Sequence, residues 1–102
     1  MAQSIPVRNN VYQEDVSAGA SGTTVLGRPA RLWDLTVVTE DSGGAIVSIS
    51  DSLGYSASSR VLKVVLAAAG TVHLSFPMGK DFGTGVSVIA NTGSVDVAAS
   101  YD

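Results

Sequence analysis

Few side chains of this chain could carry out acid–base or nucleophilic chemistry, and His73 is its only imidazole. A histidine base needs a nucleophile and an orienting carboxylate close to it in space. His73 lies in the alternating segment 71–76, where Thr71 and Ser75 share its face. Serine and aspartate are frequent enough for a Ser-His-Asp arrangement, but no nucleophile-elbow motif occurs. The sequence therefore predicts a half-exposed strand histidine and no catalytic residue.

Two adjacent acidic pairs, Glu14-Asp15 and Glu40-Asp41, could supply carboxylates to a loop-bound Ca²⁺ ion. Neither pair belongs to the calcium-loop motif of regularly spaced Asp and Asn residues. Cysteine is absent, which excludes a thiolate zinc site. Charge exposed to solvent in turns explains both pairs, so we expect no metal site and no cofactor.

The tripeptide Gly83-Thr84-Gly85 contains small residues that would let a backbone approach a phosphate. A dinucleotide-binding loop leads into a helix, whereas this one leads into the run Val-Ser-Val-Ile at 86–89, which is typical of a strand. The glycines are therefore expected to permit a bend or a bulge, and not to bind a nucleotide.

The composition predicts a surface that is poor in charge. Only 15% of the 102 residues are charged and 45% are hydrophobic, whereas an average soluble protein has about 25% charged residues. Small uncharged side chains must then cover much of a small domain. Such a surface suits a protein packed against neighbours, so we expect a homo-oligomer or a component of an assembly.

Charge and hydropathy also argue against two classes of partner. The net charge is −3, and the six basic residues are scattered and form no stripe that could follow a phosphate backbone. No apolar run approaches the roughly 20 residues of a membrane span. We expect neither nucleic-acid nor membrane binding, and residues 1–6 do not resemble a signal peptide.

From residue 30 onward the sequence is a series of short strands separated by turn residues. The strands that alternate polar and apolar residues are 30–40, 45–50, 72–76 and 94–101, and a further strand covers 86–90. The run 59–66 is apolar on both faces and predicts a buried central strand, with a helix as the competing interpretation. Seven or eight strands at this spacing predict an all-β fold, a single antiparallel β-sandwich or jelly-roll-like domain.

Turn residues predict how these strands connect. Pro77 cannot donate to a strand ladder, so it either ends the strand 72–76 or marks a sheet edge. Residues 78–80 are predicted to form a corner. Residues 91–93 are predicted to form a hairpin turn that joins 86–90 to the last strand.

The first 29 residues have a different character, with two prolines and three glycines. Only 11–16 and 23–26 look like short strands there. We interpret residues 1–29 as an extended N-terminal arm with short strands, and residues 30–102 as the β-sandwich body.

The aromatic residues allow a second interpretation of function. A sugar could stack on a platform of rings, as in carbohydrate-binding β-sandwiches; the candidates are Tyr12, Trp33, Tyr55 and Tyr101. Trp33 shares its predicted face with Leu35 and Val37, which favours the core. Tyr55 lies in a loop and is the best candidate for an exposed contact.

Three features of residues 30–102 resemble small β-sandwich structural proteins of tailed bacteriophages. The first is the strand LWDLTVV at 32–38 with AIVSISD at 45–51, and the second is VHLSFP at 72–77 leading to FGTGV at 82–86. The third is the terminal run GSVDV at 93–97 that continues to Tyr101. The arm lies outside the resemblance.

The resemblance implies a virion component without enzymatic activity, assembled many times over in the host cytoplasm. A capsid decoration (cement) protein fits best, since such proteins are short, all-β and often trimeric. Its partners would be copies of itself and the major capsid protein. Head–tail connector, tail or fibre-associated proteins are the alternatives within the virion, and a carbohydrate-binding module is the alternative outside it.

We expect five residues to contact the partner: Ile5, Val7, Val11 and Tyr12 in the arm, and Tyr55 in its loop. On this interpretation, deletion of residues 1–16 abolishes binding to the shell and leaves the β domain folded.

Overall fold

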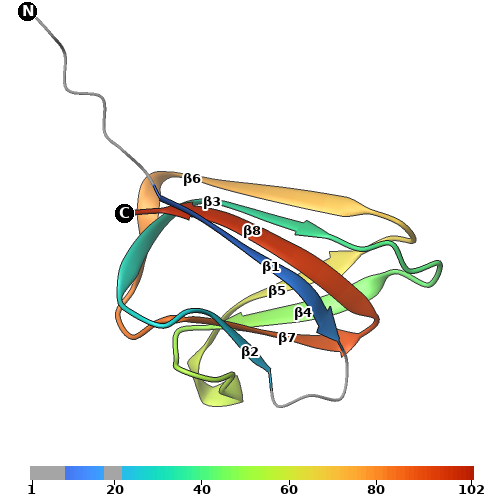
Figure 1. Ribbon diagram of the computed structural model, residues 1–102, viewed down its shortest axis with the longest axis horizontal. Coiled ribbons are helices and arrows are strands. Elements are labelled where there is room, and N and C mark those ends of the chain that lie inside the picture. Colours follow the sequence, from blue (N-terminus) through green and yellow to red (C-terminus); the bar gives the residue numbers. More distant parts are fainter. Residues whose placement is uncertain (1–8, 18–21) are drawn as a thin grey trace, which may run out of the picture.

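Two four-stranded antiparallel sheets face each other in this protein (Figure 1). The structure is a computed structural model that describes residues 9–17 and 22–102. Its strands are β1 (Asn9–Ser17), β2 (Thr23–Leu26), β3 (Ala30–Val38), β4 (Ala45–Ser50), β5 (Arg60–Leu66), β6 (Thr71–Phe82), β7 (Val86–Thr92) and β8 (Ser94–Tyr101). A single 3-10 turn, Ala57–Ser59, is the only helical element in these ranges. The predicted all-β sandwich is confirmed.

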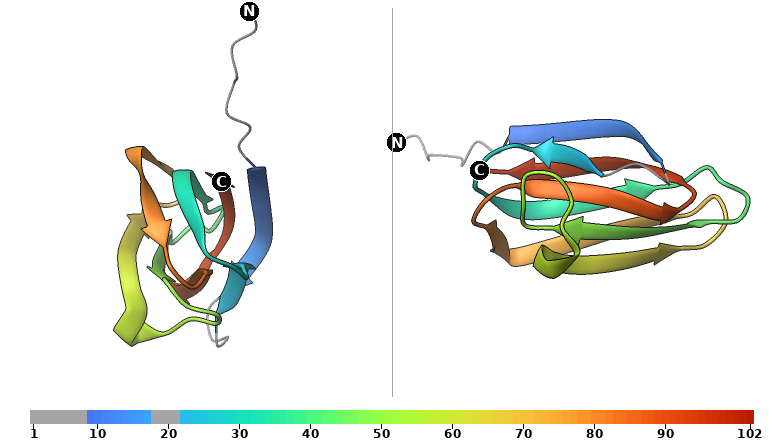
Figure 2. Two further views of the ribbon diagram at one scale, coloured as in Figure 1. Left: turned by 90° about the vertical axis from the view of Figure 1, so that its left-hand side faces the viewer. Right: turned by 90° about the horizontal axis from the view of Figure 1, so that it is seen from below.

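The order of the strands is that of a jelly roll. Sheet A has the order β1-β8-β3-β6, and sheet B has the order β2-β7-β4-β5. Strand β1 pairs with β8, β2 with β7, β3 with β6 and β4 with β5. These are the pairs of one long antiparallel ribbon that has been wound into two sheets. The end-on view in Figure 2 shows β5 and β6 along one side of the sandwich and β1 and β2 along the other.

Alternation along the strands produces the core between the sheets. Strand β8 is the clearest case, because Val95, Val97 and Ala99 are buried while the residues between them are half-buried. In β6, Val72, Leu74 and Phe76 pack against the core as predicted. The largest fully buried side chains are Phe82, Leu32, Leu35, Ile49, Val16, Val37, Val47, Val86, Val88 and Val97.

The predicted face of Trp33 is wrong, because a register shift interrupts β3 between Leu32 and Asp34. An extra residue in a strand reverses which side chains point inward. Leu32 is therefore buried together with Leu35, and Trp33 is only half-buried. Asp34 lies on the outer face of sheet A, as its alternation with the buried Leu35 requires.

The run predicted as a central strand is an edge strand. Strand β5 pairs only with β4, so the prediction that it is buried on both faces is wrong, whereas its assignment as a strand is confirmed. Val64 and Leu66 are buried, but Val65 is 66% exposed and Val61 is 37% exposed. The prediction of burial on both faces came from the apolar residues on the outer face of β5, because a strand that is apolar on both sides is typically buried on both sides.

Strand β6 continues through Pro77 as the edge of sheet A, so the edge position predicted for Pro77 is confirmed. The predicted corner at 78–80 is wrong. Its residues form an irregularity within β6, across which the pairing with β3 jumps from Ser75 to Lys80. Gly79 has a φ of +73° there, and a Cβ would collide with the side chain of Arg31. Glycine is therefore required at this position.

Residues 91–93 do not form a hairpin, because β7 belongs to sheet B and β8 to sheet A. Gly93 has a φ of +72° and crosses from one sheet to the other. A Cβ on Gly93 would lie 2.6 Å from the carbonyl oxygen of Gly44. The sequence indicated a tight turn but could not show which sheet each strand joins.

Both short strands predicted in the first 29 residues are hydrogen-bonded into the sandwich, β1 at the edge of sheet A and β2 at the edge of sheet B. Val16 is 1% exposed, and Val25 and Leu26 are also buried. The sandwich thus includes strands from the segment interpreted as an arm. Deletion of residues 1–16 would remove most of β1 and with it the buried Val16.

Candidate functional site

The outer face of sheet A carries two neighbouring rows of side chains that cross all four strands. One row consists of Tyr12, Ala98, Thr36 and His73, each paired with the next across the sheet. The other row consists of Asn10, Ser100, Asp34 and Ser75. Strands β1, β8, β3 and β6 each contribute one residue to each row. The register of the sheet therefore brings together residues up to 90 positions apart, as in the pairing of Asn10 with Ser100.

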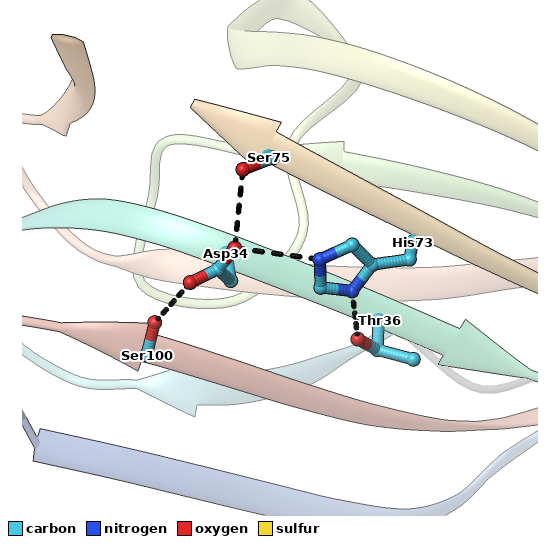
Figure 3. Close-up of polar contacts among 5 residues, drawn as sticks. All are labelled: Asp34, Thr36, His73, Ser75 and Ser100. Atoms are coloured by element: carbon cyan, nitrogen blue, oxygen red, sulfur yellow. Dashed lines mark hydrogen bonds and ion pairs between the residues drawn. The ribbon is translucent and has the colours of Figure 1, made fainter. Parts of the chain in front are cut away.

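Asp34 is the centre of the polar network on this face (Figure 3). Its Oδ1 accepts a hydrogen bond from Ser75 Oγ at 3.3 Å, and its Oδ2 accepts one from Ser100 Oγ at 3.0 Å. The Nε2 of His73 lies 3.4 Å from the same Oδ1. The Nδ1 of His73 shares a hydrogen bond of 2.7 Å with Thr36 Oγ1. With the proton on Nε2, the imidazole donates toward Asp34 and accepts from Thr36.

This order, carboxylate to imidazole to hydroxyl, is the order of a catalytic triad, with Thr36 in the place of the nucleophile. Acyl transfer also needs donors that stabilise an oxyanion close to the nucleophile. Thr36 lies in β3, which is paired on both sides, so its backbone N–H groups point within the sheet and not toward the outer face. The cluster is better suited to binding a polar group than to acyl transfer.

The two rows border a shallow hollow of about 490 Å³. Ala98 has the smallest side chain of its row and lies at the middle of the sheet, between Tyr12 and Thr36. Tyr12 is 58% exposed, and its hydroxyl donates to Asp96 Oδ2 at 3.0 Å. The volume falls in the range of small-molecule sites, but the hollow is open to solvent. An exposed ring beside small polar groups is suited to a contact with a protein or with a sugar.

Three of the five predicted contact residues are described, and they lie in two places. Tyr12 and Val11 both line the hollow, and Val11 also packs against the core. Tyr55 is half-buried in the loop between β4 and β5, where its Cβ would lie 2.5 Å from a Cβ on Gly22. Ile5 and Val7 lie outside the described residues. The assignment of the five residues to one contact surface stays a prediction.

Sequence reasoning singled out His73 but missed Asp34, Thr36 and Ser100 as its neighbours. Alternation places each of them on the outer face of a strand. The missing information was the pairing of β3 with both β6 and β8, which depends on how the whole ribbon winds.

The acidic turn residue Asp41 serves a structural purpose. Its Oδ2 accepts the backbone N–H of Ser94 at 2.6 Å, and its carbonyl oxygen accepts the N–H of Ala69 at 2.9 Å. It thus joins the turn after β3 to the start of β8 and to the turn before β6. The side chains of the other predicted pair, Glu14 and Asp15, lie outside the described part of the structure. Among the side chains that are described, no group of three or more His, Asp or Glu could hold a metal ion.

Gly83-Thr84-Gly85 does form a bend, and its backbone binds a carboxylate from the chain itself. Asp51 accepts the N–H groups of Gly83 at 2.9 Å, Thr84 at 2.8 Å and Gly85 at 3.3 Å. Desolvation opposes ionisation of Asp51, but the three backbone donors together outweigh it and hold the pKa of its carboxyl below the usual range. The N–H groups that could cradle a phosphate are therefore already used.

The sequence matches no protein-family model and no curated protein. In the described part of the chain, no helix has the length and hydropathy needed to cross a membrane.

Proposed function

We propose that this chain is a structural protein of a tailed bacteriophage particle, without enzymatic activity, and specifically a capsid decoration protein that binds the assembled shell in many symmetric copies. The observation that carries the proposal is the outer face of sheet A, a broad surface of small, mostly uncharged side chains with an exposed tyrosine. The low charge of the chain and the sequence resemblance support it.

The mechanism of such a protein is the burial of surface. Each contact of standard size covers about 800 Å² on each partner, and symmetry repeats it over the particle. Tyr12 is the contact residue that the geometry favours most, since exposed tyrosines are frequent hot spots of interfaces. On this proposal the domain forms a homo-oligomer, a trimer, and its partner is the major capsid protein.

The experiment mixes the full chain with shells of the parent phage from which the protein has been removed, and measures the bound protein by sedimentation. A matched chain without residues 1–8 keeps β1 and all the described core, so it separates the effect of residues 1–8 on binding from that of the sandwich. Saturable binding at many sites supports the proposal. A folded chain that does not bind the shells overturns it.

The hollow at Tyr12 favours a second candidate, a carbohydrate-binding module. An aromatic ring, the amide of Asn10 and the carboxylate of Asp34 line one open depression, and these groups recognise the faces and hydroxyls of sugars. Titration with a panel of monosaccharides, followed by the amide resonances of residues 10–12 and 98–100, tests it. Lack of any shift at these residues removes this candidate.

A further inference from the structure

The four edge strands of the sandwich differ in how they are protected. An open edge presents unpaired N–H and C=O groups, and natural proteins shield it with proline, bulges, charges or short strands. Strand β6 contains Pro77 and the irregularity at Gly79. The register of β1 with β8 shifts between Gln13 and Val16, and β2 has only four residues. Strand β5 has a register shift at its first residues and carries Arg60 and Lys63, but it contains neither proline nor glycine.

Strand β5 differs from the other edges in its two exposed valines. Its register with β4 is unbroken from Leu62 to Leu66, and the shift in its pairing lies at its first residues. Its outer face exposes Val61 and Val65, and Val65 lies across from the half-buried Ile46 of β4. An edge strand with a regular stretch and exposed apolar residues is a surface to which another strand can add.

An apolar groove adjoins this edge. It has a volume of about 320 Å³ and lies where β5 and β6 approach each other on the side of the sandwich seen in Figure 2. Leu62, Phe76, Pro77 and Met78 line it, and Met78 is 86% exposed. The groove could receive apolar side chains of a strand that pairs with β5.

The charge around the edge indicates what kind of strand would bind. Strand β5 carries Arg60 and Lys63, and Lys80 lies in the groove, while neither β5 nor the groove lining contains an acidic residue. Three of the six basic residues of an acidic chain thus lie on this one side. Pairing β5 with the β5 of a second copy would place four cations on one ribbon, and like charges across strands are destabilising.

We propose that β5 and the adjoining groove bind an extended segment of another protein, in which apolar residues alternate with acidic ones, by strand addition to sheet B. The segment continues the sheet with backbone hydrogen bonds, and its carboxylates face Arg60 and Lys63. This inference rests on the proposed function and deepens it, since it adds a second contact surface to the outer face of sheet A, but the chemistry of the partner does not depend on that function.

The experiment titrates the ¹⁵N-labelled full chain with a synthetic peptide, acetyl-Thr-Val-Glu-Val-Glu-Val-Thr-amide, and with the same peptide carrying lysine in place of glutamate. The acidic peptide is expected to shift the amide resonances of β5 and of the groove, and the basic peptide is expected to bind less tightly. Lys63→Glu should weaken the binding of the acidic peptide by about fivefold to tenfold and strengthen the binding of the basic one. Arg28→Glu is the matched control, since it makes the same change of charge at an exposed residue outside β5 and the groove.

Three outcomes overturn the inference: no shift in β5 at millimolar acidic peptide, equal binding of the two peptides, or a dimer of the chain that protects β5. Shell binding is measured separately on the same variants. A chain that binds the peptide at β5 but not the shell contradicts the proposed function and leaves the strand-addition site standing.

Discussion

The carboxylate of Asp51 accepts the backbone N–H of Thr84 at 2.8 Å and so fastens the loop after β4 to the turn between β6 and β7. Phe82, which is 1% exposed, and Val86, also in the core, flank that turn on either side. The contact therefore holds the two sheets in register at one end of the sandwich, as Asp41 does at the other end of β4.

Replacement of Asp51 by Asn keeps the size of the side chain but removes its charge. One amide oxygen cannot accept all three backbone donors as a carboxylate does, so we expect a loss of about 1–2 kcal/mol in the free energy of unfolding. Urea denaturation of the wild type and of Asp51→Asn measures it. Equal midpoints would show that the turn is held by other contacts.

The same carboxylate makes stability depend on pH. Because the pKa of Asp51 is lower in the folded than in the unfolded chain, its contribution is fully present above the unfolded value of about 3.8 and is lost as the pH falls through the folded value. We expect the difference in stability between the wild type and Asp51→Asn to shrink below pH 4. A difference that stays constant down to pH 2 would contradict this account.

Gly93 is predicted to be irreplaceable at the crossing from β7 to β8. An alanine there would have to adopt a positive φ and would place its Cβ against the backbone of Gly44. Gly93→Ala should therefore lower the free energy of unfolding by about 1–3 kcal/mol or more. Gly43→Ala is the control, because its Cβ would meet no atom within 4 Å. Thermal unfolding of both variants makes the comparison, and similar losses in the two would refute the crossing geometry.

Two neighbouring valines of β5 test its place at the edge. Val64 is 7% exposed and Val65 is 66% exposed. Substitution of Val64 by Thr buries a hydroxyl and should cost about 1–2 kcal/mol, while Val65→Thr should change stability by less than about 0.5 kcal/mol. A large loss in Val65→Thr would restore the interpretation of β5 as a central strand.

Tyr12, in the edge strand β1 of sheet A, provides a test of the proposed function. Tyr12→Ala removes an exposed ring, so the fold should persist while binding to the shell weakens by about tenfold or more. Tyr12→Phe separates the ring from the hydrogen bond to Asp96 and should keep most of the affinity. Near-UV circular dichroism checks the fold of both variants. Unchanged shell binding by Tyr12→Ala would remove the outer face of sheet A from the interface.

Much of the fold can be predicted from local sequence, because alternation along a strand reports directly which side chains are buried. The strand 94–101 and the residues 72, 74 and 76 were predicted in this way. The failures share a cause. The shift at Trp33, the edge position of β5 and the crossing at Gly93 all depend on which strands pair, and pairing in a jelly roll joins segments far apart in the chain.

The candidate site illustrates the same limit. His73 is conspicuous as the only histidine, whereas Asp34 acquires its role only when β3 lies between β6 and β8. Asp51 is similar, since its loop gives no sign that the glycines at 83 and 85 are its partners. Side chains that act through long-range pairs cannot be recognised by spacing alone.

The central claim is that the protein decorates a capsid in many symmetric copies. Quantitative mass spectrometry of purified particles of the parent phage, with the major capsid protein as the internal standard, tests it most directly. The account predicts hundreds of copies per particle, in a fixed ratio to the capsid protein, since decoration follows the symmetry of the shell. A count of about a dozen, as expected of a ring-shaped connector, or absence from the particle, would contradict it.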